Sequence, residues 1–327
     1  MDVPNDVLNP NVTASTTIRA LKDITFGSIA GMVSKVFEHP FDLTKVRLQS
    51  QVLDSSARFN GPIDCLHKTW KNEGFRGLYR GLPAPIVGAM AENASLFMSY
   101  RVFRQIIQKI TNKTESEKPS LSEIVLAAAG AGAVTSFALT PIELVKCKMQ
   151  VQMLVSPTTL TTPPPGPVAV LTSVVRSTGI RGLWLGHTGT LIRETGGTAA
   201  WFGTKEFVAS KLVQRRARLD PSGSDPHTLV LTPLESGLSG ACAGAAFNLI
   251  LFPADTVKSA IQTEEELRPR HAGNSTPRPT FFGTLKAMYK AQGVRGLYAG
   301  CGITVARSIP SSAIIFLIYD ELNKHFG

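Results

Sequence analysis

The sequence predicts an all-α membrane protein in which six transmembrane helices form three pseudo-symmetric repeats, each with a short surface helix. Three observations lead to this prediction. A proline, an acid two residues later, a lysine three beyond it and a glutamine four further recur at 40–49, 141–150 and 253–262. A glycine-rich motif follows each copy. The stretches 124–141 and 237–253 carry no charge and continue into the motif, so they can cross about 30 Å of hydrocarbon.

The composition argues against several other classes of protein. The chain has 327 residues, of which 43% are hydrophobic, and a net charge of +10. Its basic residues are spread along the chain without an aromatic-interleaved strip, so we expect no nucleic-acid partner. The cysteines and histidines are scattered without ligand or nucleophile spacing. This pattern predicts no metal site, no cofactor and no enzymatic activity.

The expected organisation is a short lead followed by three repeats. Residues 1–20 lack the pattern of a secretory signal or a transit peptide, and we expect them to form a disordered lead. The repeats are expected at 21–110, 120–214 and 232–325. Inserts rich in proline and threonine at 156–167, and in charge at 264–279, are expected to be loops.

The first long helix of each repeat is expected to contain the proline motif, and in the first repeat it runs from near Lys22 towards Gln49. Small residues occur nine and thirteen positions before each proline: Gly31 and Gly27, Gly132 and Ala128, Gly244 and Gly240. Such spacing lets helices approach closely in lipid. We therefore expect the first helices of the repeats to pack through these residues.

The motif itself predicts bent helices that carry paired charges. The prolines, Pro40, Pro141 and Pro253, each remove one backbone hydrogen bond and bend the helix. An acid and a lysine follow at i and i+3 on one helix face: Asp42 and Lys45, Glu143 and Lys146, Asp255 and Lys258. Charges at membrane depth normally face a bundle interior or a water-filled cavity. The three pairs therefore predict a ring around a central axis.

The second half of each repeat is also marked in the sequence. The motif Gly-x-Arg-Gly-Leu-aromatic-x-Gly occurs at 74–81, 179–186 and 293–300. Amphipathic spacing just before it predicts short helices on the membrane surface at 65–72, 168–177 and 282–291. A second long helix then crosses back at 83–107, 188–213 and 303–322. Three such units place both termini on the same side of the membrane.

Together these motifs resemble those of the mitochondrial carrier family, from about Thr25 to Lys324. The resemblance implies a pseudo-threefold bundle in the mitochondrial inner membrane, with both termini in the intermembrane space, that exchanges small solutes by alternating access. It further implies a monomer in a lipid bilayer that includes cardiolipin. In that family the motif charges form a matrix-side gate between neighbouring first helices, and the positions that brace it are matched by Gln49, Gln150 and Gln262.

Two departures from the family pattern bear on the gates. The second basic residue of the motif, present as Arg47 and Lys148, is Ala260 in the third repeat. At the opposite end of the bundle the family's acid-and-base pattern is incomplete, and Asp320 is the acid that the third repeat offers there. A weak gate at that end favours the state that is closed to the matrix.

Solute selection is expected where the threefold pattern is broken, because a small solute is asymmetric. Seven residues after the last glycine of each glycine-rich motif lie Gly88, Arg193 and Arg307; one further lie Ala89, Glu194 and Ser308; eleven after it lie Glu92, Gly197 and Ser311. The unmatched charged residues are thus Glu92, Arg193, Glu194 and Arg307, and Lys35 and Glu38 are further candidates for the cavity wall. A guanidinium can grip an α-carboxylate while the glutamates take ammonium groups.

This set looks most like the family members, especially fungal ones, that carry ornithine, arginine and lysine. Such an exchange would link cytosolic and matrix arginine and ornithine metabolism. Two alternatives stay open. A carnitine/acylcarnitine carrier of the same family also holds a zwitterion, although its single fixed cation leaves a second cavity carboxylate unexplained. A structural membrane protein without transport activity is the alternative from another class.

Overall fold

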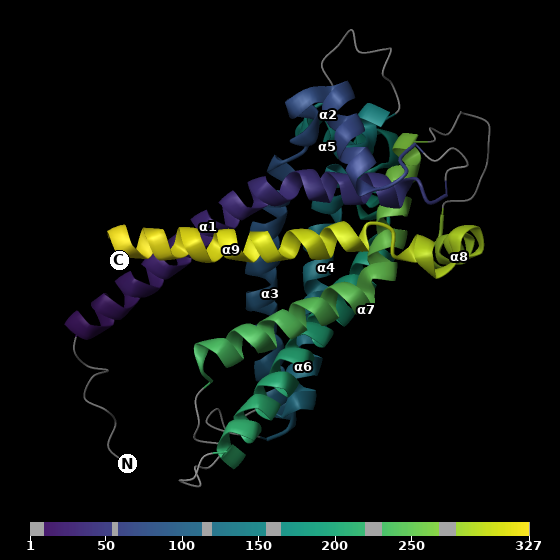
Figure 1. The fold of residues 1–327 in the computed structure, drawn as a ribbon. Helices are drawn as coiled ribbons and strands as arrows, with labels where there is room; N and C mark the ends of the chain where they lie inside the picture. The colour runs from purple at the N-terminus through teal and green to yellow at the C-terminus, as the bar shows by residue number, and fades with distance from the viewer. Residues whose placement is uncertain are drawn as a thin grey trace.

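The computed structural model describes residues 10–53, 58–112, 120–154, 165–219, 231–267 and 279–326. These residues are mostly helical, and Figure 1 shows long helices crossing one another. The long helices are α1 (Pro10–Ser50), α3 (Pro83–Ile110), α4 (Leu121–Val151), α6 (His187–Leu219), α7 (Pro233–Leu267) and α9 (Cys301–Phe326). The short ones are α2 (Pro62–Leu78), η2 (Gln152–Leu154), α5 (Pro167–Thr178), η3 (Ile180–Trp184) and α8 (Phe281–Leu297).

The order of long helix, short helix and long helix recurs three times, which confirms the predicted all-α repeat architecture. Two of the long helices, α4 and α7, contain stretches long and apolar enough to cross a membrane, at Leu121–Val151 and Leu234–Glu264. The start of α4 is fixed by a capping box, in which Ser120 and Glu123 each accept the other's backbone N–H.

Two predicted boundaries are wrong. Helix α1 begins at Pro10, so residues 10–20 are helical and not part of a disordered lead. Proline suits the first turn of a helix, where its missing N–H would have no partner. Helix α7 continues to Leu267, past the predicted start of the second insert, and near its end Glu266 pairs with Lys148 of α4 at 3.0 Å. Residues 1–9 and most of both inserts lie outside the described residues.

The long helices pack in two groups. Helices α3, α4, α6 and α7 pack one against the next, whereas α1 packs chiefly against α9. Figure 1 shows α1 and α9 lying close together across the other helices, and we call them the α1–α9 pair. The pair has few contacts with α3 on one side and with α7 on the other. The bundle is therefore loosely packed at two seams, α1 to α3 and α7 to α9.

The predicted small-residue packing holds in the second repeat. Ala128 and Gly132 of α4 lie buried against α6, where the Thr198 hydroxyl donates to the Ala128 carbonyl at 2.9 Å. A Cβ on Gly132 would overlap the backbone oxygen of Glu194, so only glycine permits this approach.

The same prediction is wrong for the glycines of the first and third repeats whose surroundings are described. A Cβ on Gly31, Gly240 or Gly244 would meet no atom within 4 Å. By the pseudo-symmetry, Gly31 of α1 would face α3, and Gly240 and Gly244 of α7 would face α9. These are the two helix pairs that pack loosely in this structure. The side-chain surroundings of Gly27 lie outside the described part of the chain.

Aromatic residues of the glycine-rich motif complete the hydrogen bonding around two of the prolines. Because proline has no N–H, the carbonyl four residues before it loses its helical donor. In the second repeat the Trp184 indole donates to that carbonyl, on Phe137, at 3.2 Å. In the third repeat the Tyr298 hydroxyl donates to the equivalent carbonyl, on Leu249, at 3.1 Å. The two sequence motifs thus meet in space, and each stabilises the other.

The surface helices are held by different contacts in different repeats. In the first repeat Arg47 is fully buried and binds Glu73 of α2 through two hydrogen bonds at 2.6 and 2.8 Å. The equivalent residues in the third repeat are Ala260 and Gln292, and there the Gln292 amide donates to the Val52 carbonyl at 3.1 Å. An apolar cluster, Val257, Ile261, Met288 and Leu297, fixes the end of α7 against α8.

Candidate functional site

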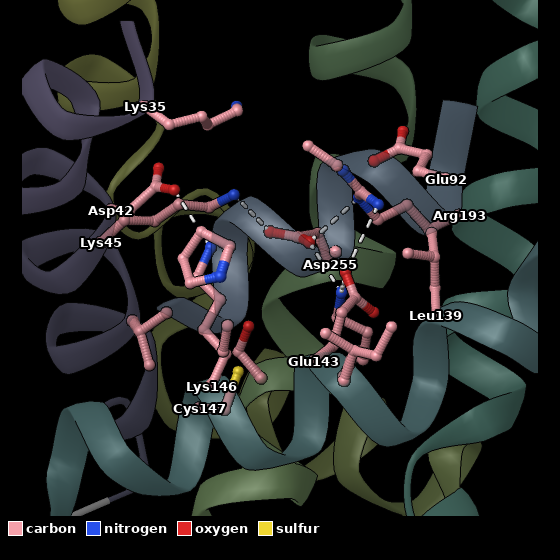
Figure 2. A pocket seen from close by; sticks show the side chains of 18 of the residues that line it. Lys35, Asp42, Lys45, Glu92, Leu139, Glu143, Lys146, Cys147, Arg193 and Asp255 are labelled. Carbon is pink, nitrogen blue, oxygen red and sulfur yellow. Dashed lines mark hydrogen bonds and ion pairs between the residues drawn. The ribbon is translucent and has the colours of Figure 1, made fainter. Parts of the chain in front are cut away.

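A cavity of about 150 Å³ lies between the long helices beside the three proline motifs. Figure 2 shows charged side chains from several helices pointing into this central cavity. Its charged lining residues are Lys35, Asp42, Lys45, Glu92, Glu143, Lys146, Arg193, Asp255, Lys258 and Arg307. The structure therefore brings together the charged residues that the sequence assigned to substrate or gate, apart from Glu194 and Glu38, neither of which lines the cavity.

The motif charges pair between repeats and close a ring. Lys146 of α4 binds Asp42 of α1 at 3.0 Å. Lys258 of α7 binds Glu143 of α4 at 2.9 Å, and Lys45 of α1 binds Asp255 of α7 at 2.6 Å. We call these three pairs the gate ring. Their side chains are at most 22% exposed, so water screens the attraction between the charges only partly.

The prolines and glutamines of the motif have unequal surroundings. Pro40, Pro141 and Pro253 lie inside α1, α4 and α7. The Gln49 amide donates to the Asp255 carboxylate at 3.3 Å and so supports one pair of the gate ring. The Gln262 amide donates instead to a backbone carbonyl of Leu185, and the buried amide of Gln150 has no hydrogen-bond partner among the described residues. A brace to a gate acid is therefore present in one repeat of the described structure.

Arg193, on α6, contacts two acids of the gate ring. Its guanidinium lies 3.1 Å from Asp255 and 3.7 Å from Glu143, and it donates a hydrogen bond to Glu194. The ring of Phe247 lies 5.2 Å from the guanidinium carbon and adds a cation–π contact. A residue predicted to hold substrate thus also contacts two gate acids.

Arg307, on α9, makes the corresponding contacts with α1. It lies 2.7 Å from Glu38 and 3.2 Å from Asp42. Glu38 also binds Lys35 at 2.7 Å and accepts a hydrogen bond from the Ser311 hydroxyl. This network joins the α1–α9 pair and fixes the position of the guanidinium.

Glu194 differs from the prediction that it faces the cargo. It is 1% exposed and does not line the central cavity. Close packing of α6 on α4 at Gly132 buries its backbone, and its carboxylate is directed at Arg193. In this structure the carboxylate orients the arginine rather than the cavity contents.

Glu92, on α3, is the cavity acid whose charge acts on Arg193 without forming a close ion pair. Among the described residues it has no hydrogen bond or ion pair, in contrast to the other three acids that line the cavity. Figure 2 shows it near Arg193 at the upper rim of the cavity. Its carboxylate is therefore available to a ligand.

Several contributors to the site were not predicted from the sequence. One is Ser34, whose hydroxyl lies 2.6 Å from that of Ser311 and within hydrogen-bond distance of Glu38. Another is Thr190, whose hydroxyl donates to Glu143 at 3.3 Å. Hydroxyls carry no charge signal in a sequence, although Ser311 occupies the position equivalent to Glu92 and could have been noticed there. The described residues contain no cluster of three or more candidate metal ligands.

Comparisons with known proteins agree with this geometry. The sequence profile described as "Mitochondrial carrier protein" matches residues 16–111, 117–216 and 230–327. The chain is 39% identical over 305 residues to "Mitochondrial ornithine transporter 1" of Saccharomyces cerevisiae, covering 93% of this chain and 95% of that protein. It is 34% identical over 318 residues to "Mitochondrial carnitine/acylcarnitine carrier-like protein" of Arabidopsis thaliana (94% and 99% covered). It is 30% identical over 310 residues to "Mitochondrial arginine transporter BAC1" of the same plant (94% and 94%).

The three profile matches coincide with the three structural repeats, and the motifs that define those repeats surround the central cavity. The predicted resemblance is confirmed: the chain belongs to the mitochondrial carrier family.

Proposed function

We propose that this protein exchanges ornithine and related basic amino acids, arginine and lysine, across the mitochondrial inner membrane by alternating access. The observation that carries the proposal is the unpaired Glu92 carboxylate in a cavity that also presents the guanidiniums of Arg193 and Arg307. The similarity to ornithine and arginine transporters from a yeast and a plant supports the same class of cargo.

The cavity chemistry suits a zwitterion with an extra cation. Guanidinium groups bind carboxylates through parallel hydrogen bonds, so Arg193 and Arg307 are the proposed partners of the cargo's α-carboxylate. Glu92 is the proposed partner of a cargo cation. Lys35 lines the same cavity and would repel a second cation on its side, which favours one orientation of the cargo.

The gate ring is the proposed barrier to the matrix. Charge-assisted pairs contribute roughly 1.5–3 kcal/mol each, and a micromolar ligand binds with about 8 kcal/mol, so three pairs and one cargo are comparable. A ligand shifts two states only by its difference in affinity for them. Arg193 and Arg307 touch both the cavity and the gate acids, so a cargo carboxylate that draws them away weakens the ring.

The remaining features follow from this proposal. The surface helices and the gate ring would face the matrix, and both termini would face the intermembrane space. The protein would act as a monomer in the bilayer, in contact with cardiolipin. The exposed apolar side chains of the long helices, for example Met98, Leu126 and Leu317, would then contact lipid.

Uptake into liposomes tests the function. Purified protein should exchange external labelled ornithine, arginine or lysine for internal ornithine, and Glu92→Gln should lower this exchange at least tenfold while leaving the apparent Tm near wild type. Exposed Glu206→Gln, on the same kind of helix but away from the cavity, is the matched control and should exchange normally.

The second candidate is carnitine/acylcarnitine exchange, which the similarity to the Arabidopsis carrier-like protein favours. The same liposomes should be tested with labelled carnitine. Strong carnitine exchange without ornithine exchange would assign the protein to this alternative, and the absence of any exchange by folded protein would favour a structural role.

A further inference from the structure

The end of α7 differs from the ends of the other two helices that carry the proline motif. Helices α1 and α4 each end one residue after their motif glutamine, whereas α7 continues five residues past Gln262, to Leu267. The added residues bring Glu266 to the end of α4, where it binds Lys148 at 3.0 Å. Neither residue lines the central cavity, and both follow the gate residues along their helices. The pair therefore joins the second repeat to the third beyond the gate ring.

Lys148 is a buried cation to which its own repeat offers no acid at the expected position. It occupies the motif position of Arg47, whose partner in the first repeat is Glu73 of the neighbouring surface helix. The second repeat has Thr178 at the position of Glu73. Lys148 is 3% exposed, and a buried ammonium without a counter-charge is costly. Glu266 therefore supplies, across a repeat boundary, the charge that Glu73 supplies within the first repeat.

An apolar cluster lies next to this ion pair, where the three repeats meet. Its members are Val46 of α1, Cys147 and Val151 of α4, Leu154 of η2 and Leu267 of α7. Leu267 directly follows Glu266, and Cys147 directly precedes Lys148, so the cluster and the ion pair hold the same two helix ends together.

The other two repeat boundaries also have contacts beyond the gate ring. Between the first and second repeats, the Arg58 guanidinium donates to the Leu154 carbonyl at 2.7 Å. Between the third and first repeats, the Gln292 amide donates to the Val52 carbonyl at 3.1 Å. We call these two hydrogen bonds and the Lys148–Glu266 pair the outer closure. Its one ion pair is the contact between α4 and α7.

We propose that Glu266 is a gate residue, because its pair with Lys148 must break each time the gate ring opens. Opening separates α4 from α7 at their motifs, and a contact that joins these helices beyond the motifs cannot persist when they part. A carrier without cargo has to break the pair with no binding energy to offset it. The pair thus raises the barrier to the return of the empty carrier and favours exchange over one-way transport. This inference rests on the proposed function in requiring a gate at the motif end, and it holds for either candidate cargo.

One-way efflux from liposomes measures that barrier. The liposomes contain labelled ornithine, and the outside solution contains either no cargo or unlabelled ornithine. Glu266→Gln keeps the size of the side chain but removes its charge. The ratio of efflux to exchange should rise about tenfold, which corresponds to the lower limit for one charge-assisted pair. The apparent Tm should fall, because buried Lys148 loses its counter-charge.

Two further variants separate a gate from general stabilisation. Glu73→Gln removes the equivalent charge within the first repeat, so the Tm should fall while the ratio of efflux to exchange stays within about threefold of wild type. The double variant Lys148→Glu/Glu266→Lys restores an ion pair in the reverse sense and should bring the ratio back to within about threefold of wild type. Lys148→Glu alone places two acids together and should raise the ratio at least as much as Glu266→Gln.

The outcomes separate the two proposals. If wild type exchanges neither ornithine nor carnitine, the proposed function fails, and the outer closure has no gate to hold. If wild type exchanges one of these solutes but Glu266→Gln leaves its one-way efflux unchanged, the role of Glu266 is wrong and the proposed function stands. That role is equally wrong if Glu73→Gln raises efflux as much as Glu266→Gln, or if the double variant is no better than Lys148→Glu alone.

Discussion

At the scale of single residues, the three acids of the gate ring differ in how many cations surround them. Asp255 has Lys45, Lys258 at 3.4 Å and Arg193 at 3.1 Å. Asp42 has Lys146 and Arg307, whereas Glu143 has Lys258 and, more distantly, Arg193 at 3.7 Å. The pseudo-symmetric lysines are therefore not equivalent in energy.

Replacing each gate lysine by methionine should expose this difference. Lys258→Met leaves Glu143 with the weakest remaining partner, so we expect the largest loss, about 3 kcal/mol of stability for a buried acid without its partner. Lys146→Met should lower the stability less than Lys258→Met does, and Lys45→Met should lower it least, by about 1 kcal/mol. Apparent Tm values in detergent, measured without ligand, should fall in that order. Equal losses in the three variants would contradict the unequal surroundings.

Glu38 is expected to position Arg307. Glu38→Gln removes the charge that lies 2.7 Å from the guanidinium but keeps a side chain of similar size. We expect the KM for ornithine to rise about tenfold, a cost of roughly 1.4 kcal/mol, because Arg307 then turns fully to Asp42. Glu38→Asp should recover part of the affinity. An unchanged KM in folded Glu38→Gln would show that Arg307 needs no such support.

Charged side chains made much of the site predictable from the sequence, whereas its uncharged hydroxyl groups gave no such signal. Ionised side chains in an apolar helix stand out in a sequence, so the gate ring and Arg193 could be identified from it. Whether Glu194 faces the cavity or an adjacent helix depends on a small rotation of α6, set by its packing at Gly132. No local pattern encodes that rotation.

At the scale of helices, Gly132 is the point of closest approach between α4 and α6. A Cβ there would overlap the Glu194 backbone, which cannot move without shifting α6. Gly132→Ala should therefore destabilise by about 1–3 kcal/mol and lower exchange. Gly244→Ala, in the equivalent position of α7, meets nothing within 4 Å and should be neutral or slightly stabilising. Thermal unfolding of the two variants side by side gives the test, which fails if they behave alike.

The aromatic donors give a second matched comparison between repeats. Tyr298→Phe removes the hydroxyl that donates to the Leu249 carbonyl and should cost about 1 kcal/mol. The equivalent Tyr79 stacks on His39 with ring centres 6.1 Å apart, and its hydroxyl donates no such hydrogen bond within the described part of the chain. Tyr79→Phe should therefore leave the apparent Tm unchanged. A similar fall in both variants would mean that the hydroxyl of Tyr79 also has a stabilising role.

Helix order and approximate bounds followed from the sequence, whereas helix neighbours did not. Hydrophobic stretches, motif prolines and motif glycines mark where each helix lies, and the observed α3, α5 and α8 agree with those marks. The small-residue pattern is present in all three first helices but is used for close packing in α4. Whether two such faces touch depends on the state of the bundle, which the sequence of one helix does not specify.

At the scale of the whole molecule, the central cavity is closed by the gate ring, and two loose seams flank the α1–α9 pair. That a weak gate at the opposite end favours this state stays a prediction, because the side chain of Asp320 lies outside the described residues. Opening the gate requires α1, α4 and α7 to separate at their motifs, so the α1–α9 pair must shift against the other four helices.

A disulfide within the pair tests whether α1 and α9 make this shift as one unit. The hydroxyls of Ser34 and Ser311 lie 2.6 Å apart, so Ser34→Cys/Ser311→Cys should form a disulfide on oxidation. If the pair shifts as one unit, the cross-link does not hinder it, so we expect the oxidised double variant to exchange within about threefold of its reduced form. Native Cys65 should not interfere, since burial raises the pKa of its thiol to about 11. A loss of at least tenfold on oxidation, restored by dithiothreitol, would mean that α1 and α9 must also move relative to each other.

The pairing of α1 with α9 also constrains how the molecule is assembled. Almost the entire chain separates these two helices, so any insertion that proceeds from the N-terminus places α1 in the bilayer before its main neighbour. Until then Glu38 and Asp42 lack Arg307 and lie uncovered in hydrocarbon, a costly arrangement that invites wrong partners. A circular permutant that links the present termini and opens the chain between two repeats would make α9 and α1 consecutive, and it should insert faster and with less need of chaperones.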